Sequence, residues 1–259
     1  MSQPPRPEDD QYQLSTLVRR VLSVGDVGLR RRQMERHLLT VDAATAAAHL
    51  EALFGPALVG DFEAAEVLFA LFETLLQPEG KVALALEAVQ LEARRSNGAA
   101  LGWFLLDPPP HRTIDLLRAK GGGDRSQSLG ERRAQAAGWN TALLERLLDD
   151  PDPMVIERLA ANPRLTERQV VTLVSARPNR AERLAAVMAV SRWNRKAEVR
   201  SAVAQNPYAP TGLAIRALPF ASRGDLDRIR FAGDLHPILR EAAAFFVTLR
   251  EQTPPFEAT

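Results

Sequence analysis

The stretch Val155-Ile-Glu-Arg-Leu-Ala-Ala-Asn-Pro163 returns forty-four residues later as Val199-Arg-Ser-Ala-Val-Ala-Gln-Asn-Pro207. In both copies an apolar-periodic run stops at Asn-Pro, and a short turn leads to a second apolar run. Proline lacks an N–H and disfavours helical backbone in the residue before it, so each Asn-Pro should end a helix at the same place. A phrase repeated in this way predicts helices stacked in an array.

Weaker copies of the phrase lie around this pair. Glu182-Arg-Leu-Ala-Ala186 matches Glu157-Arg-Leu-Ala-Ala161 at an offset of twenty-five, and Thr141 precedes Thr166 by the same offset. Spacings of twenty-five and nineteen define a unit that holds one helix, a tight turn and a shorter helix. Such a unit buries its apolar face only against its neighbours, so we expect a short α-solenoid over residues 131–250.

Structural roles account for most residues of the repeats. Ser128 with Glu131, and Thr166 with Gln169, have the spacing of a capping box at a helix start. The side chains of Asn162 and Asn206 should hydrogen-bond backbone groups left open where the helices break. We expect the stacked interior to consist of Leu159, Val170, Leu173, Leu184, Val187, Val203 and Ile215.

Residues 12–120 predict a separate helical bundle without a clean repeat. Apolar residues recur at helical spacing over 12–24, 27–39, 43–54, 62–76 and 81–93. Asp61 should cap the fourth of these helices, and either Thr40 or Asp42 the third. The run 81–93 is apolar on more than one face, so it is predicted to be the most buried helix of this half.

The boundary between the two halves is predicted at residues 121–130, a stretch with four glycines and no apolar periodicity. A phosphate-binding loop is not favoured there, because no Gly-Lys-Ser/Thr follows and no buried strand precedes. Residues 1–11 and 251–259 are interpreted as tails.

Composition agrees with a chain of the all-α class. Apolar residues make up 46% of the 259 residues and aromatic residues 6%, and alternating β-branched runs are almost absent. The chain has no cysteine, which excludes disulfides and thiolate metal sites. No signal-peptide pattern and no apolar run of the roughly 20 residues that span a bilayer is present, so we expect a cytoplasmic protein without membrane insertion.

The order of Val-Ile or Val-Arg, an Ala-rich helix, Asn-Pro, a Thr/Pro turn and a Leu-rich segment resembles the leucine-rich repeat variant family. The stretches Leu129–Arg133, Asp150–Ile156, Asn162–Thr166 and Asn206–Pro210 are also similar to a group of bacterial helical-repeat proteins. The resemblance covers about the last half of the chain and implies alternating α and 3-10 helices, related to HEAT-like solenoids, in a binding scaffold. The family's iron–sulfur module needs clustered cysteines, so that function is not implied here.

Charge is distributed unevenly along a chain whose net charge is +1. Between residues 154 and 200, ten basic residues face four acidic ones. Arg158 and Arg183 occupy equivalent repeat positions and Arg200 lies two places short of the next, so stacking could align them as a ridge. The candidate partner-binding residues are Arg158, Arg164, Arg168, Arg180, Arg183, Arg192, Trp193, Arg195, Lys196 and Arg200.

Three interpretations of this ridge remain open: plain solvated surface, a face for an acidic protein, or a face for nucleic-acid phosphates. The isoelectric point of about 8.2 is lower than that of a dedicated nucleic-acid binder. Trp139 and Trp193 each lie in an inter-helix turn beside an asparagine. Trp193 with Arg192 and Arg195 has the composition of an interaction hot spot, but a tryptophan in such a turn more often packs between units, so packing is favoured for both.

No constellation in the sequence predicts catalysis, a cofactor or a metal. The four histidines lack metal-ligand spacing, and no nucleophile elbow occurs. Asp149, Asp150 and Asp152 lack EF-hand spacing, and they are better explained as an acidic turn before a helix N-terminus. Asp150 with Trp139 would be the only candidate pair for a glycosylase, and it is not favoured.

From these observations we expect a non-enzymatic helical scaffold that binds a protein partner through its Arg-rich face. The alternative is a solenoid that binds nucleic-acid backbone through the same ridge. Neither the partner nor the oligomeric state can be read from the sequence.

Overall fold

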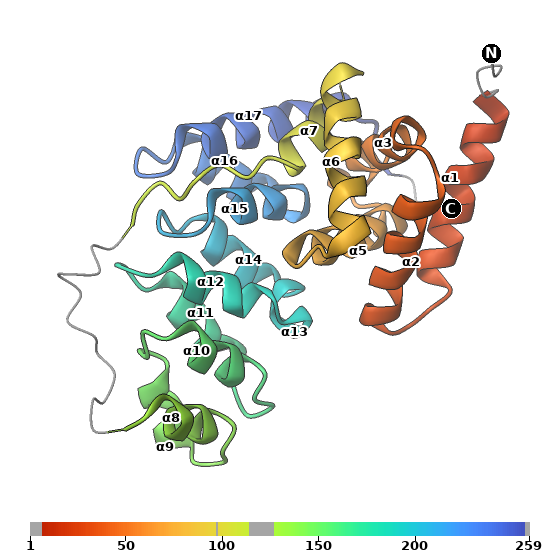
Figure 1. The fold of residues 1–259 in the computed structure, drawn as a ribbon. Helices are drawn as coiled ribbons and strands as arrows, with labels where there is room; N and C mark the ends of the chain where they lie inside the picture. The colour runs from red at the N-terminus through yellow and green to blue at the C-terminus, as the bar shows by residue number, and fades with distance from the viewer. Residues whose placement is uncertain (1–6, 97, 114–126, 257–259) are drawn as a thin grey trace. The chain divides into compact units, whose positions relative to one another are not determined.

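The computed structural model describes residues 7–96, 98–113 and 127–256, and the protein is all-α (Figure 1). Within these ranges the chain contains no β-strand. Two compact units are present: one consists of residues up to Leu106 together with those from Phe245 onward, and the other is Asp107–Ala244. No helix in the described ranges has the length and apolar character needed to cross a membrane.

As far as the structure describes it, the first unit contains seven helices before Leu106 and the C-terminal part of α17. The helices are α1 (Pro7–Leu22), α2 (Val27–Thr40), α3 (Ala43–Glu51), α4 (Phe54–Leu58), α5 (Phe62–Leu76), α6 (Gly80–Arg95), α7 (Ala99–Phe104) and α17 (Pro237–Gln252).

Helix α5 is the centre of the first unit. It packs against α1, α2 and α4, and every residue from Val67 to Thr74 is buried. Asp61 caps it by accepting a hydrogen bond from the N–H of Ala64, as expected. Asp42, one of the two candidate caps, is the residue that caps α3.

The prediction that residues 81–93 form the most buried helix of this half was wrong. In α6 only Leu86, Val89 and Ala93 are buried, because α2, α3 and α7 cover one side of the helix. Leu84 and Leu91 lie on the opposite side, where they are 65% and 49% exposed.

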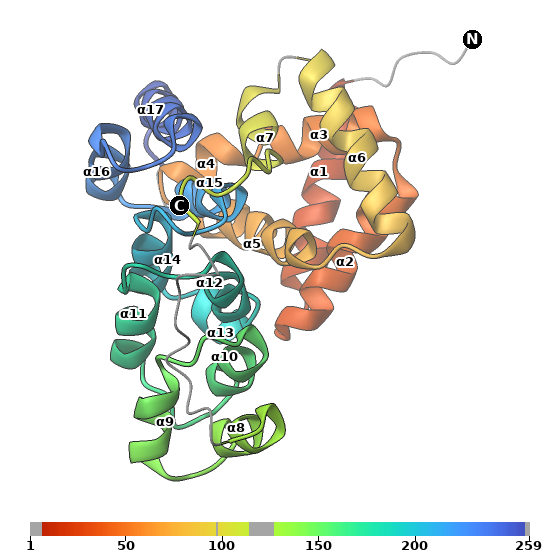
Figure 2. The same cartoon turned by 60° about the vertical axis from the view of Figure 1, so that its left-hand side comes forward.

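The second unit is made of short helices. They are α8 (Leu129–Ala136), α9 (Thr141–Leu147), α10 (Pro153–Ala160), α11 (Glu167–Ser175), α12 (Ala181–Met188), α13 (Ser191–Asn194), α14 (Ala197–Ala204), α15 (Thr211–Ala217), η1 (Leu218–Phe220) and α16 (Arg223–Phe231), followed by the first part of α17. Helix α10 packs against both α8 and α12, and α11 packs against α14. Figure 2 shows α8, α10 and α12 following one another along one side of this unit.

Both Asn-Pro phrases end helices, as expected, and both asparagines make the same contacts. The amide of Asn162 donates to the carbonyls of Ala136 and Gly138 at 2.8 and 2.9 Å. The amide of Asn206 donates to those of Val174 and Ala176 at 2.7 and 3.1 Å. In each case the side-chain oxygen accepts from the N–H two residues further on. Each asparagine thus completes the C-terminal end of another helix with one side chain.

The burial predicted for seven apolar residues of this unit is confirmed. The expected core residues are all at most 3% exposed, namely Leu159, Val170, Leu173, Leu184, Val187, Val203 and Ile215. Both predicted capping boxes are also present, Ser128 with Glu131 and Thr166 with Gln169.

The limits of the units differ from the boundaries expected from composition. Helix α1 begins at Pro7, which is favourable at a first helical position, so residues 7–11 of the expected tail are helical. Residues 107–113 belong with the second unit, where the N–H of Arg112 donates to the carbonyl of Pro207. Residues 1–6, most of the glycine-rich stretch (121–126) and residues 257–259 lie outside the described ranges.

Candidate functional site

The ten candidate residues of the Arg-rich face separate into three groups by exposure. Arg183, Trp193 and Arg200 are buried. Arg180 and Arg195 are half-buried. The exposed candidates are Arg158, Arg164, Arg168, Arg192 and Lys196.

Arg183 and Arg200 do not belong to an exposed ridge, and the expected alignment with Arg158 is corrected in this respect. Arg183 donates to the side chain of Asn179 at 3.0 Å and to the carbonyl of Leu148, the residue that ends α9. Arg200 donates to the carbonyl of Asn194 at the end of α13, also at 3.0 Å. Burial lowers the pKa of Arg183, and burial with the nearby charge of Arg195 lowers that of Arg200 to about 10. Both guanidinium groups therefore hydrogen-bond carbonyl groups at the C-terminal ends of helices.

Trp193 is a packing residue, as the sequence favoured. Its indole N–H donates to the carbonyl of Ala160 at 2.7 Å, and the side chain is 1% exposed. The guanidinium of Arg192 stacks on this ring, 4.3 Å from its centroid. The same guanidinium donates to three carbonyls of the loop after α10, those of Asn162, Pro163 and Leu165, at 3.0–3.4 Å.

Arg164 lies in that same loop and stacks on a second tryptophan. Its guanidinium carbon is 4.4 Å from the ring centroid of Trp139, whose side chain is 72% exposed. The packing role favoured for Trp139 from the sequence is therefore wrong, whereas that for Trp193 holds. The bond from the Asn162 amide to the carbonyl of Gly138 ties the Trp139 turn to the loop. Lys196 follows Arg192 closely and pairs with Glu167 at 3.1 Å. We call Trp139, Arg164, Arg192 and Lys196 the Trp–Arg cluster.

The exposed arginines of this face are not neutralised locally. Within the described ranges, Arg158, Arg164, Arg168 and Arg192 make no ion pair with a carboxylate. Lys196 is the exposed candidate that does have such a partner. Four exposed candidates therefore have no carboxylate partner within the described ranges, and the guanidinium groups of Arg164 and Arg192 are held over indole rings.

The acidic turn before α10 has the structural role expected of it. Asp152 caps α10 by accepting from the N–H of Met154. Asp150 is 3% exposed and receives a hydrogen bond from Arg132 at 2.8 Å. Its carboxylate is thus held between a guanidinium and the N–H of Asp152.

The histidines, scattered in the sequence, form two pairs in the structure. The rings of His37 and His49 lie 5.4 Å apart in the first unit, and those of His111 and His236 lie 5.6 Å apart in the second. Burial, with His49 and Arg20 adding to it, lowers the pKa of His37 to about 4. Among the described residues no group of three His, Cys, Asp or Glu side chains is placed to hold a metal ion.

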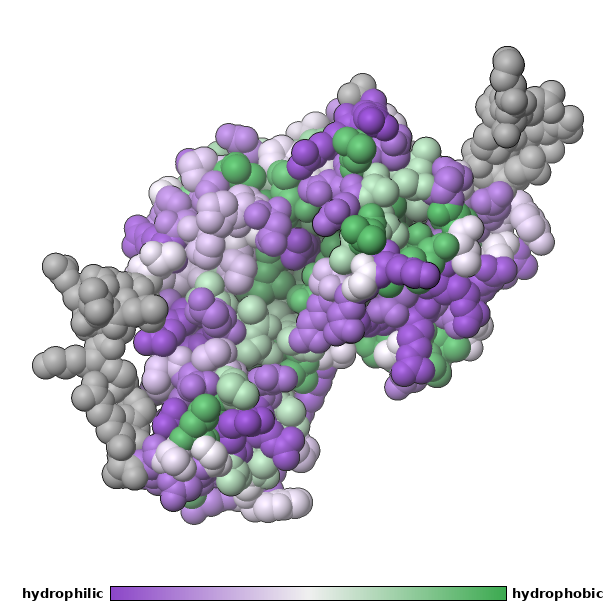
Figure 3. Space-filling model, viewed as in Figure 1, coloured by the Kyte–Doolittle hydropathy of each residue, from purple (hydrophilic) through white to green (hydrophobic). Residues whose placement is uncertain are grey.

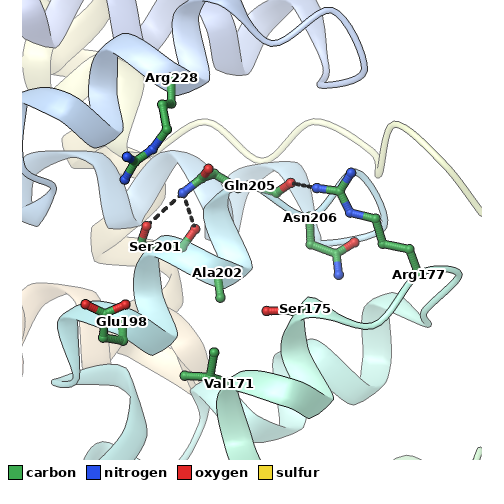
Figure 4. A pocket seen from close by; sticks show the side chains of 9 residues that line it. All are labelled: Val171, Ser175, Arg177, Glu198, Ser201, Ala202, Gln205, Asn206 and Arg228. Atoms are coloured by element: carbon green, nitrogen blue, oxygen red, sulfur yellow. Dashed lines mark hydrogen bonds between the residues drawn. The ribbon is translucent and has the colours of Figure 1, made fainter. Parts of the chain in front are cut away.

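A cavity of about 350 Å³ lies between α11, α14 and α16 of the second unit (Figure 4), and sequence reasoning missed it. It is lined by Val171, Ser175, Arg177, Glu198, Ser201, Ala202, Gln205, Asn206 and Arg228. Figure 4 shows the amide of Gln205 pointing back to Ser201, to whose hydroxyl it donates at 2.8 Å. The apolar pattern of the sequence predicts only the buried faces of these helices, whereas mostly polar residues between the helices line the cavity.

The charges of this cavity are largely balanced. Arg177 pairs with Asp234 at 2.8 Å, and Arg228 donates to Asp225. Asp225 also accepts from Ser201 and Ser222; burial would raise its pKa, but these hydrogen bonds and Arg228 lower it overall. Glu198 has no cation partner within the described ranges. The lining thus offers hydroxyl, amide and carboxylate acceptors, which suit a neutral or cationic polar group better than an anion.

Comparison of this chain with protein-family models, with curated proteins and with solved structures gave no match.

Proposed function

We propose that the protein is a non-enzymatic helical-repeat adaptor that binds an acidic segment of a protein partner through the exposed part of its Arg-rich face. The observation that carries the proposal is the Trp–Arg cluster, in which Arg164 and Arg192 are oriented by stacking and lack carboxylate partners within the described ranges. Tryptophan and arginine dominate the energetic centres of protein interfaces. Cationic groups that are held in place lose less conformational entropy on binding.

The binding face that we propose is smaller than the sequence suggested. It consists of the Trp–Arg cluster together with Arg158 and Arg168. Three of the original candidates are buried and have a structural role instead. Each donates a hydrogen bond to a backbone carbonyl at or near a helix end, namely Arg183, Trp193 and Arg200. We further propose that the second unit is a repeat array of the leucine-rich repeat variant or HEAT-like kind, in which each Asn-Pro phrase joins one repeat to another.

A charge-reversal experiment tests the proposal. Partners captured by the wild-type protein are compared with those captured by Arg158→Glu/Arg164→Glu/Arg168→Glu, with Arg36→Glu as a control for charge reversal outside the face. Arg36 is an exposed arginine of α2 in the first unit, outside the proposed face. We expect the triple variant to lose the main partner and the control to retain it, while circular dichroism stays unchanged. Equal recovery with the triple variant would exclude this face as the binding site.

The exposed ring of Trp139 beside Arg164 also favours a second candidate, the binding of single-stranded nucleic acid. A base can stack on the indole while the guanidinium contacts a phosphate. Gel retardation at low salt distinguishes the two functions, because phosphate binding weakens log-linearly as salt rises. We expect no retardation of single- or double-stranded DNA. Retardation abolished by Trp139→Ala would favour this second candidate.

A further inference from the structure

Helix α6 presents a second apolar face that no part of the described chain covers. Leu84 is 65% exposed and Leu91 49%, and Ala88 between them is exposed as well. Spacings of four and three residues place these side chains in one row along the helix. They lie opposite Leu86 and Val89, which face the core. Figure 3 shows hydrophobic side chains reaching the surface along α6. We call Leu84, Ala88 and Leu91 the α6 seam.

Cationic side chains lie at both ends of the α6 seam. Lys81 is one turn before Leu84, and Arg94 and Arg95 are one turn after Leu91; all three are exposed. Arg95 pairs with Glu92 at 2.8 Å, whereas Lys81 and Arg94 have no carboxylate partner within the described ranges. Lys81 and Arg94 are about 20 Å apart along the helix axis, given the rise of 1.5 Å per residue. Glu87 is exposed near the middle of the row.

From this arrangement we propose that the α6 seam docks an amphipathic helix of a partner protein, whose apolar stripe is flanked by acidic residues at both ends. A helix laid along α6 buries its own apolar row against Leu84 and Leu91, in the manner of helix-in-groove recognition. Acidic residues at its ends meet Lys81 and Arg94, and a basic residue near its middle meets Glu87. A partner helix of this kind covers the apolar row and also neutralises the charges that flank it.

Charge argues against a second copy of this chain as the occupant. In an antiparallel twofold pair, Lys81 of one copy lies opposite Arg94 of the other. In a parallel pair each cation lies opposite its own equivalent. Both arrangements bring like charges together, which opposes association. The α6 seam belongs to the first unit, so this inference is independent of the function proposed for the second.

Binding of two synthetic helical peptides by the full chain tests the proposal. Both are about 18 residues long, enough to span the seam, and carry the same leucine row. One has glutamates at both ends and the other has lysines. Fluorescence anisotropy should show binding of the acid-ended peptide at least about tenfold tighter, a difference of roughly 1.4 kcal/mol. The Lys81→Glu/Arg94→Glu variant should reverse that preference.

Variants of the α6 seam distinguish specific docking from nonspecific hydrophobic binding of the peptide. Leu84→Ser/Leu91→Ser should weaken binding of the acid-ended peptide at least about tenfold. The matched control Leu29→Ser/Leu129→Ser changes two exposed leucines outside α6 and should bind like the wild type. Circular dichroism verifies that all variants keep their helical content.

Four outcomes would overturn the inference. They are equal affinity for the two peptides, no binding of either, retained binding by Leu84→Ser/Leu91→Ser, and a dimer in sedimentation that this variant abolishes. The last outcome would assign the seam to self-association.

Discussion

The two units of this protein satisfy their backbones in different ways. In the first unit, α1, α5 and α6 have fifteen or sixteen residues each, whereas none of α8 to α16 in the second exceeds nine. Every helix leaves four N–H and four C=O groups without intrahelical partners, so short helices have more open groups per residue. The first unit is built around an apolar helix. Side chains bond helix ends in both units, but those of the first unit that donate to carbonyls, such as Arg31 to Gln77 and Gln90 to Leu105, are only half-buried.

This difference explains which residue types are buried in each unit. In the second unit Asn162, Asn206, Arg183 and Arg200 are buried, and each donates to at least one backbone carbonyl. Burial of a polar side chain costs less free energy when it makes such hydrogen bonds.

The largest effect is expected in the apolar core of the first unit. Phe72 of α5 is 0% exposed, so Phe72→Ala should remove about 3–5 kcal/mol from the free energy of unfolding of this unit. The control Phe62→Ala, at a position 67% exposed, should change it by less than about 0.5 kcal/mol. Hydrogen exchange of amides in α1, α2 and α5 measures the loss. Equal effects of the two variants would contradict the central place given to α5.

Acid should destabilise the first unit through His37. Its pKa is about 4 in the folded protein, against the ordinary value of 6.5 that an unfolded chain has, so the unfolded state binds the proton more tightly. The contribution of His37 to the free energy of unfolding is therefore complete above pH 6.5, the pKa of the unfolded chain. It is lost as the pH falls toward about 4, the pKa of His37 in the folded protein. It amounts to roughly 3 kcal/mol between these limits.

Hydrogen exchange of α2 and α3 at about pH 7.5 and about pH 5 measures this effect. His37→Leu should reduce the pH dependence of these helices, because the titrating group is removed. The control His111→Gln, in the second unit, should leave it unchanged. A pH dependence of equal size in His37→Leu and the wild type would assign the effect to other groups.

The helix-end bonds of the second unit come next in size. Asn162→Ala and Asn206→Ala each remove the donor to two carbonyls, and each should cost about 1–3 kcal/mol. Asn206→Asp keeps the acceptor for the N–H of Tyr208 but cannot donate, so it should cost as much as the alanine variant. Chemical denaturation followed by circular dichroism compares the three variants. A wild-type midpoint for Asn162→Ala would show that these bonds are dispensable.

The smallest effect concerns Arg192, which donates from the surface. Arg192→Ala loses three partly exposed hydrogen bonds and the stacking on Trp193, at an expected cost of about 1 kcal/mol. Arg168→Ala is the control, because Arg168 is exposed and has no ion-pair partner within the described ranges. Thermal denaturation should separate the two variants. Identical melting temperatures would show that Arg192 contributes no more to the stability of the fold than Arg168 does.

Sequence reasoning succeeded where the relevant interaction is local. The Asn-Pro stops, the capping boxes and the buried row from Leu159 to Ile215 each depend on spacing within a helix or its adjoining turn. It failed where a residue's surroundings come from distant segments. Arg183 carries the charge of a surface residue, yet it is buried and donates to the carbonyl of Leu148 in a distant segment of the chain. The apolar pattern of α6 likewise predicted burial on a side that no helix in the described ranges covers.

The sequence by itself determined the all-α class, the helix ends at Asn162 and Asn206, and the interior of the second unit, because periodicity and proline act within one turn of the chain. The tertiary structure alone decided which arginines of the candidate face are exposed. It also formed the histidine pairs, opened the cavity between α11, α14 and α16, and left the α6 seam uncovered. Each of these depends on which segments meet in space, and burial arises from packing between segments that the order of residues along one helix does not specify.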